Sequence, residues 1–133
     1  MISTPIQIRF SDCDMLKHVN NAIYLQYFET ARINFFNLEL PNWNWTKNGV
    51  ILLKNIVEYK IPLYLTDTCK VEIECSHIGT KSFTLTYKIQ VKKDKNVITK
   101  TIGESILVCY DFTQEETINL PTDLKDALLK HKI

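Results

Sequence analysis

The segment AIYLQYFETARINFFNL, residues 22–38, narrows the folds that are open to this chain. Its composition favours a helix, but on a helical wheel Leu25, Ile33 and Phe36 fall among the polar positions, so no wide polar face remains. A helix that is apolar nearly all round is usually buried by other elements. We therefore expect a long central helix that a sheet wraps.

The second half of the chain changes to the two-residue period of β-strands. Residues 69–77 and 83–91 alternate apolar with polar side chains, and residues 78–81 between them are typical of a turn. In the first run the side predicted to be buried carries Cys69, Val71, Ile73, Cys75 and His77. Further strands are predicted at 6–10, 50–59 and 97–110, and a short helix after Pro121. Short turns imply antiparallel pairing, so the predicted class is α+β.

The chain length fits one domain, residues 1–133, and its composition is 45% apolar and 23% charged residues. The formal net charge of +1 gives no general attraction to nucleic acid. The first residues lack the pattern of a secretory signal and no apolar run is long enough to span a membrane, so no membrane partner is expected. The four cysteines form no CxxC pair, and we expect free thiols in a reducing cytoplasm.

Polar groups are concentrated in SDCDMLKHVNN, residues 11–21, directly before the predicted helix. Extended to RFSDCDMLKHVNNAIYLQYFETAR, residues 9–32, this stretch resembles the signature of hotdog-fold acyl-CoA thioesterases of the 4-hydroxybenzoyl-CoA thioesterase group. In that signature an aromatic residue and two Asp precede His-Val-Asn-Asn, and Phe-Glu-x-Ala-Arg follows along the helix. Weaker agreement at residues 61–87 and 120–129 extends the resemblance over nearly the whole chain.

The resemblance implies a hotdog fold, an antiparallel sheet wrapped around the central helix. It also implies assembly as a homodimer or homotetramer with active sites at the subunit interface. The implied reaction is hydrolysis of an acyl-CoA to the free carboxylic acid and CoA, without cofactor or metal. An acyl carrier protein in place of CoA, and the identity of the acyl chain, stay open.

By resemblance, Asp14 matches the family's catalytic acid, acting as general base or as nucleophile. Asn21 falls where the family uses a backbone amide to polarise the thioester carbonyl. The chemistry fits these positions, because thioester hydrolysis needs a base near the carbonyl and donors for the oxyanion, and a helix N-terminus supplies unpaired N–H groups. An Asp before a helix is also commonly a turn or cap residue.

Three neighbouring residues complete the predicted loop. His18 is a third catalytic candidate, because the His of a similar run is thought to take part in plant acyl-carrier-protein thioesterases; a structural role is the alternative, since Leu16 stands where their motif has Asn. Asp12 is expected to bond the loop backbone rather than act as a second acid. Lys17 stands where relatives usually carry Gly, so the loop geometry depends on whether Lys17 adopts a positive φ.

Substrate-binding candidates come from two other segments. Lys81 and Ser82, in the turn at 79–82, are candidates for the CoA phosphates, because relatives often contact CoA there; a solvated turn lysine is the alternative. Glu29 is a candidate for lining the site, although it can instead pair with Arg32 three residues on or with the opposite subunit.

Two other functions fit the same fold. A module that binds an acyl thioester or a protein without turnover would keep the buried helix but would not need Asp14. Hotdog dehydratases and hydratases also act on acyl thioesters, but the hydratase motif Asp-x-Asn-Pro-x-His is absent from this sequence. GxSxG and the nucleotide-binding glycine motifs are absent too. Thioester hydrolysis is therefore the leading interpretation.

Overall fold

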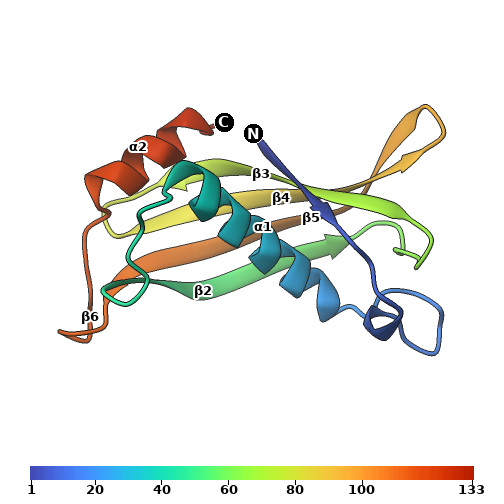
Figure 1. Ribbon diagram of the computed structural model, residues 1–133, viewed down its shortest axis with the longest axis horizontal. Coiled ribbons are helices and arrows are strands. Elements are labelled where there is room, and N and C mark those ends of the chain that lie inside the picture. Colours follow the sequence, from blue (N-terminus) through green and yellow to red (C-terminus); the bar gives the residue numbers. More distant parts are fainter.

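The computed structural model describes residues 1–133 and consists of an antiparallel sheet covered by helices. In chain order the elements are β1 (Ile2–Ile6), a 3₁₀ turn (Phe10–Asp12), α1 (Ile23–Glu39), β2 (Asn48–Tyr59), β3 (Thr68–Ile78), β4 (Ser82–Lys93), β5 (Asn96–Asp111), β6 (Glu116–Thr117) and α2 (Thr122–Lys130). The strand order is β1-β3-β4-β5-β2, with β6 paired to β5 (Figure 1). The predicted α+β hotdog fold is confirmed.

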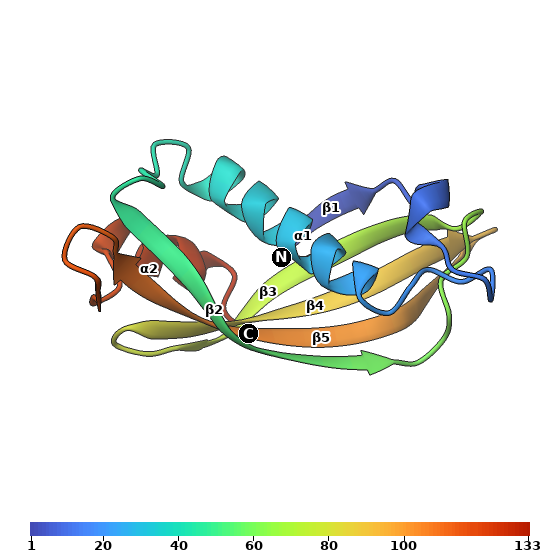
Figure 2. The same ribbon diagram turned by 90° about the horizontal axis from the view of Figure 1, so that it is seen from below.

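The long helix α1 lies across one face of the sheet (Figure 2). Its Phe28 is fully buried and stacks on Tyr87 of β4, with ring centroids 4.3 Å apart and planes inclined by 10°. Gly103 of β5 lies directly under this ring, and a Cβ at that position would overlap Phe28. The glycine therefore sets how closely the helix approaches the sheet.

Within one chain, α1 is covered on one side only, which corrects the expectation of a fully wrapped helix. Tyr24, Phe28 and Phe35 face the sheet and are buried. On the other side, Ile33 keeps 43% of its surface exposed, and Leu38, near the end of the helix, keeps 61%. The reason is geometric: the sheet of one chain contacts one side of the helix, while apolar residues occur all round it.

Two strand predictions are also corrected. The first strand is Ile2–Ile6 rather than 6–10, because the chain leaves its pairing with β3 after Ile6 and turns into the 3₁₀ segment, where Phe10 is exposed. In β3 a bulge between Cys75 and His77 breaks the alternation, so His77 is exposed instead of sharing the buried side with Cys75.

The end of α2 and the N-terminus meet beside the C-terminal end of α1. His131 lies with Nε2 3.0 Å from Glu39 Oε1 and with Nδ1 2.8 Å from the Met1 amino group. Lys130 Nζ is 3.2 Å from the other Glu39 oxygen. The contact with His131, followed by that with Lys130, holds the pKa of the Glu39 carboxyl below its ordinary value. Neither helix has the length and apolarity needed to cross a membrane.

Candidate active site

The polar stretch before α1 forms a tight hairpin. The Asp14 N–H donates to the His18 carbonyl at 2.9 Å, closing the tip. The Asn20 N–H donates to the Asp12 carbonyl at 2.9 Å, closing the base. This pairing turns the chain back, so residues 12–14 lie beside residues 18–20, which lead into the helix.

Asp14 is exposed at the tip of this hairpin. Its Oδ1 accepts the Leu16 N–H at 2.9 Å, and its carbonyl accepts the Lys17 N–H at 3.0 Å. Lys17 has a φ of 64°, so the lysine does adopt the left-handed conformation that glycine would take with less strain. One carboxylate oxygen thus fixes the turn, and Asp14 Oδ2 has no donor within the chain.

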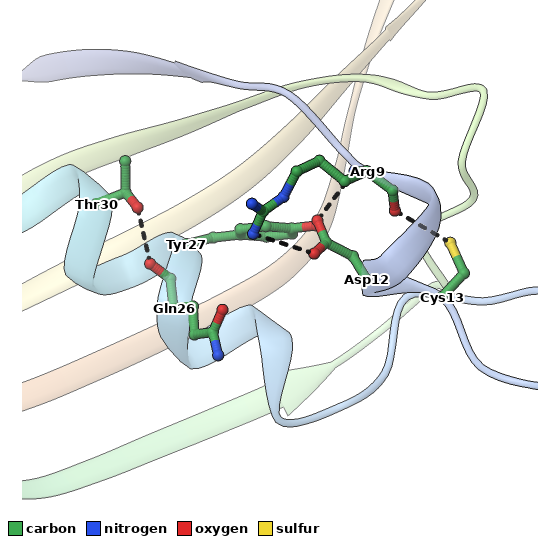
Figure 3. A network of polar contacts seen from close by, with 6 residues as sticks. All are labelled: Arg9, Asp12, Cys13, Gln26, Tyr27 and Thr30. Atoms are coloured by element: carbon green, nitrogen blue, oxygen red, sulfur yellow. Dashed lines mark hydrogen bonds and ion pairs between the residues drawn. The ribbon is translucent and has the colours of Figure 1, made fainter.

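Asp12 stabilises the base of the hairpin from inside (Figure 3). Only 2% of its surface is exposed, and its Oδ2 accepts the Tyr27 O–H at 2.7 Å and the Arg9 N–H at 3.0 Å. Burial, and then the hydrogen bond to Asp12, raise the pKa of the Tyr27 hydroxyl. The structure therefore assigns Asp12 to the loop backbone, as the sequence predicts, and ties it to α1 through Tyr27.

The segment that enters α1 leaves the backbone donor of Asn21 free. Asn20 Oδ1 accepts the Ala22 N–H at 2.9 Å, and the Asn20 carbonyl accepts the Ile23 N–H at 2.9 Å. The Asn21 carbonyl accepts the Tyr59 O–H at 2.9 Å, but the Asn21 N–H donates to no acceptor in the chain. An unpaired N–H at the positive end of a helix is well placed to bind a developing negative charge.

The hairpin rests on residues 61–67, which cross from β2 to β3. The Val19 N–H donates to the Leu63 carbonyl at 2.9 Å, and the Leu63 N–H donates to the Tyr24 hydroxyl at 3.0 Å. The His18 ring meets Tyr64 edge to face, with centroids 5.3 Å apart. His18 thus packs against the crossing segment, next to Asp14 in the fold.

Glu29 and Arg32 occupy the flank of α1 that faces β2. Arg32 Nη2 and Glu29 Oε2 are 3.9 Å apart, with Arg32 buried and Glu29 exposed, so the predicted pair is present. Arg32 Nη1 also donates to the Tyr87 hydroxyl at 3.1 Å and the Ser105 hydroxyl at 3.3 Å. The Ser105 O–H in turn donates to Asn55 Oδ1 at 2.6 Å. Sequence reasoning missed this network, because its members lie on three strands far along the chain.

A cavity of about 200 Å³ opens between α1 and β2 beside this pair. Its lining is mostly apolar and consists of Glu29, Arg32, Ile33, Phe36, Trp45, Val50, Leu52 and Leu107. Trp45 packs on Phe36, with ring centroids 4.9 Å apart, and closes one side. Glu29 therefore lies at the rim of an apolar cavity.

The structure does not bring Lys81 and Ser82 to Asp14 within one chain. Their turn joins β3 to β4 at one end of the sheet, and the hairpin lies at the other end (Figure 1). Ser82 pairs with Val108, whereas Tyr59, beside the hairpin, pairs with Thr101. These two positions of β5 are roughly 23 Å apart at the usual rise per residue.

Comparisons with known proteins place this geometry in a family. The family model that matches, over residues 8–128, is described as the thioesterase-like superfamily. The long-chain acyl-CoA thioesterase FadM of Escherichia coli (strain K12) is 26% identical over 129 residues, which are 96% of each chain.

Solved structures are similar over the same length. A thioesterase from Thermus thermophilus, complexed with coenzyme A and Zn, is 27% identical with a TM-score of 0.81 over 95% of both chains. The dynemicin thioesterase, only 12% identical, has a TM-score of 0.91 over 98% of this chain and 96% of its own, a likeness of fold. The predicted class of thioester hydrolases is thereby confirmed at the level of the family, and the chain belongs to the thioesterase-like superfamily.

Proposed function

We propose that this protein hydrolyses an acyl-CoA thioester to a free carboxylic acid and CoA, with Asp14 and the Asn21 N–H at the reacting carbonyl. One observation carries the assignment of the site: within the short stretch that leads into α1, Asp14 Oδ2 at the hairpin tip and the Asn21 N–H before the helix both have no partner in the chain. A free carboxylate oxygen and a free helix donor are the two groups that thioester hydrolysis needs.

The Asn21 N–H donates to the thioester oxygen and, with the helix dipole, stabilises the charge that develops there. As a general base, Asp14 takes a proton from water while the water oxygen bonds to the carbonyl carbon. Breaking of the C–S bond then releases CoA thiolate, which receives that proton. As a nucleophile, Asp14 instead forms an anhydride and expels CoA, and water hydrolyses the anhydride. Both routes give the same products.

His18 remains the third catalytic candidate on the same hairpin. Its ring packs on Tyr64, so a substitution that removes the ring disturbs packing as well as chemistry. His18→Phe keeps an aromatic ring against Tyr64 and removes the titratable nitrogens. A loss of turnover in that variant supports a chemical role for His18.

A second copy of the chain would bring the predicted CoA-binding residues to Asp14. β2 is an edge strand of the sheet, with its outer edge unpaired and Leu53 and Ile56 exposed. We propose an isologous homodimer, alone or within a homotetramer, in which the two β2 edges pair about a two-fold axis. The axis exchanges the ends of the sheet, so the partner's Lys81 and Ser82 lie at the same end as Asp14.

The acyl chain is proposed to extend from Asn21 along the exposed flank of α1 toward the cavity that Glu29 borders. The mostly apolar lining of this cavity supports an aliphatic or aromatic acyl group rather than a polar one. The long-chain substrate in the name of the Escherichia coli relative supports the aliphatic choice. CoA is the proposed carrier, acyl carrier protein the alternative, and the cytoplasm the proposed location, in keeping with the four free thiols.

CoA release from aromatic, short-chain and long-chain acyl-CoAs tests the proposal, with wild type beside Asp14→Asn. The asparagine Oδ1 can still accept the Leu16 N–H, so the turn is retained while the base is lost. We expect turnover to fall by about 10²- to 10⁴-fold with acyl-CoA binding largely kept. Asn21→Ala is the matched control, since only its backbone is used, and it should keep most activity.

Three outcomes decide between the candidate functions. Unchanged hydrolysis by Asp14→Asn removes Asp14 from the mechanism. Binding of every ester without turnover by wild type favours the non-catalytic module, unless an acyl carrier protein ester is cleaved. Consumption of an enoyl or hydroxyacyl ester without CoA release would instead identify a hydratase or dehydratase.

A further inference from the structure

Lys100 of β5 is a buried cation at the end of the sheet that carries the hairpin. Only 6% of its surface is exposed. Its Nζ donates to Asp67 Oδ2 at 2.8 Å and to the Pro62 carbonyl at 2.9 Å, and lies 4.9 Å from the centre of the Tyr64 ring. A buried ammonium is strongly destabilising unless its donors are satisfied, and here every one of these partners belongs to the segment that crosses from β2 to β3.

The backbone of Lys100 holds the same segment at its start. The Lys100 carbonyl accepts the N–H groups of Lys60 and Ile61, both at 3.0 Å. At the far end, Asp67 Oδ2 also accepts the Tyr64 N–H at 2.9 Å, which folds the segment into a turn around the Lys100 ammonium. Lys100 therefore bonds residues 60–67 through both its backbone and its side chain.

The same segment also contacts the elements of the proposed active site. Leu63 accepts the Val19 N–H of the hairpin and donates to Tyr24 in the first turn of α1. Tyr64 supports the His18 ring. The two sides of the site, the hairpin with Asp14 and the start of the helix, are thus both joined to the segment that Lys100 holds.

From this chain of contacts we propose that Lys100, through Asp67, is a positioning residue for catalysis: it fixes residues 60–67, which hold Asp14 and the Asn21 N–H in register. Lys100 touches no reacting atom. The proposal rests on the proposed function for its kinetic consequence, but its structural step, control of the hairpin by the Lys100–Asp67 ion pair, stands on the contacts alone.

The test uses Lys100→Met, Asp67→Asn and the double variant, with Lys88→Met as matched control on the exposed side of β4. Methionine keeps the apolar stem and removes the charge. Each single variant leaves an unpaired buried group, whereas the double variant leaves no unpaired charge and should regain part of the lost thermal stability. The double variant also keeps the test informative if a single variant does not fold.

We expect the folded double variant to lose about 10- to 100-fold in kcat, with KM within about two-fold of wild type, because a small misplacement of a catalytic group has that effect. We also expect faster hydrogen exchange at the Val19 amide, with core strand amides unchanged. A purely structural role for Lys100 predicts instead that kcat returns together with Tm in the double variant. That result, or unchanged Val19 exchange, overturns the proposal.

The exchange measurement separates this proposal from the proposed function. If wild type cleaves no thioester, or Asp14→Asn is fully active, the proposed function fails. Val19 exchange then still reports whether Lys100 holds the hairpin. If turnover depends on Asp14 but the double variant keeps full kcat, the positioning proposal alone fails.

Discussion

Replacement of Tyr27 by Phe tests how strongly the buried Asp12 carboxylate stabilises the fold at the base of the hairpin. The change removes one hydroxyl and keeps the ring that packs within the core. That hydroxyl donates to Asp12 Oδ2 at 2.7 Å, the shortest hydrogen bond that the carboxylate accepts. Asp12 and Tyr27 expose only 2% and 5% of their surfaces, so water cannot readily replace the lost donor.

The expected loss of stability depends on the contacts that the Asp12 carboxylate keeps in this variant. The Arg9 N–H at 3.0 Å is kept, and the Arg9 guanidinium at 3.6 Å is too exposed, at 68% of its side chain, to compensate. Loss of a hydrogen bond to a buried charge costs about 2 kcal/mol. For a chain of this length that corresponds to a fall in Tm of roughly 7 °C.

Thermal unfolding at neutral pH measures the effect, with Tyr110→Phe as the control, because the Tyr110 hydroxyl has no partner in the chain and should shift Tm by little. The pair Tyr27→Phe and Asp12→Asn completes a double-mutant cycle. We expect the Tyr27→Phe cost to shrink by about 1 kcal/mol in the Asp12→Asn background, where the acceptor is neutral. A Tm within about 1 °C of wild type for Tyr27→Phe refutes the reasoning.

Two further predictions concern other ionisable groups of the chain. Burial raises the pKa of the Cys69 thiol to about 12 and that of Cys109 to about 11, and Cys75 is buried too. A thiol reagent near pH 8 should therefore label Cys13 rapidly in the folded protein and the other cysteines only after unfolding; a second fast thiol contradicts this. The lowered pKa of Glu39 means that its pairing stabilises the fold above the ordinary carboxyl pKa and is lost as pH falls through the lowered value. Glu39→Gln should thus lower Tm by a few degrees at pH 7 but not at about pH 3, and an equal difference at both pH values would exclude the linkage.

The fold could be predicted because its determinants are local. The alternation at 83–91 and the apolar segment at 22–38 each fix an element from consecutive residues, and both elements are present. The errors occur where the register depends on a partner strand. β1 begins at Ile2 because it pairs with β3, and the bulge that exposes His77 appears only when β3 lies against β4. Neither effect leaves a periodic signal in the sequence.

The candidate site, too, could be predicted from the sequence only in part. Asp14, His18 and Asn21 lie in one hairpin, so a contiguous motif was enough to group them. The supports of that hairpin could not be found in this way, because Tyr59 and Lys100 come from distant strands and carry no motif of their own. Their side chains look like ordinary strand residues until the crossing segment is folded over them.

The one-sided burial of α1 bears on how the chain assembles. A helix that is apolar all round implies cover on every side, yet the sheet of one chain leaves Ile33 exposed and, across the cavity, Leu52 at 40%. The same flank adjoins the unpaired edge of β2, and Lys81 lies at the wrong end of the chain's own sheet. The proposed two-fold pairing of β2 accounts for all three features, because it covers the flank, pairs the edge and supplies a second Lys81 at the end that carries Asp14. The helical wheel, on this view, describes the burial of the helix in the assembled protein rather than in the single chain.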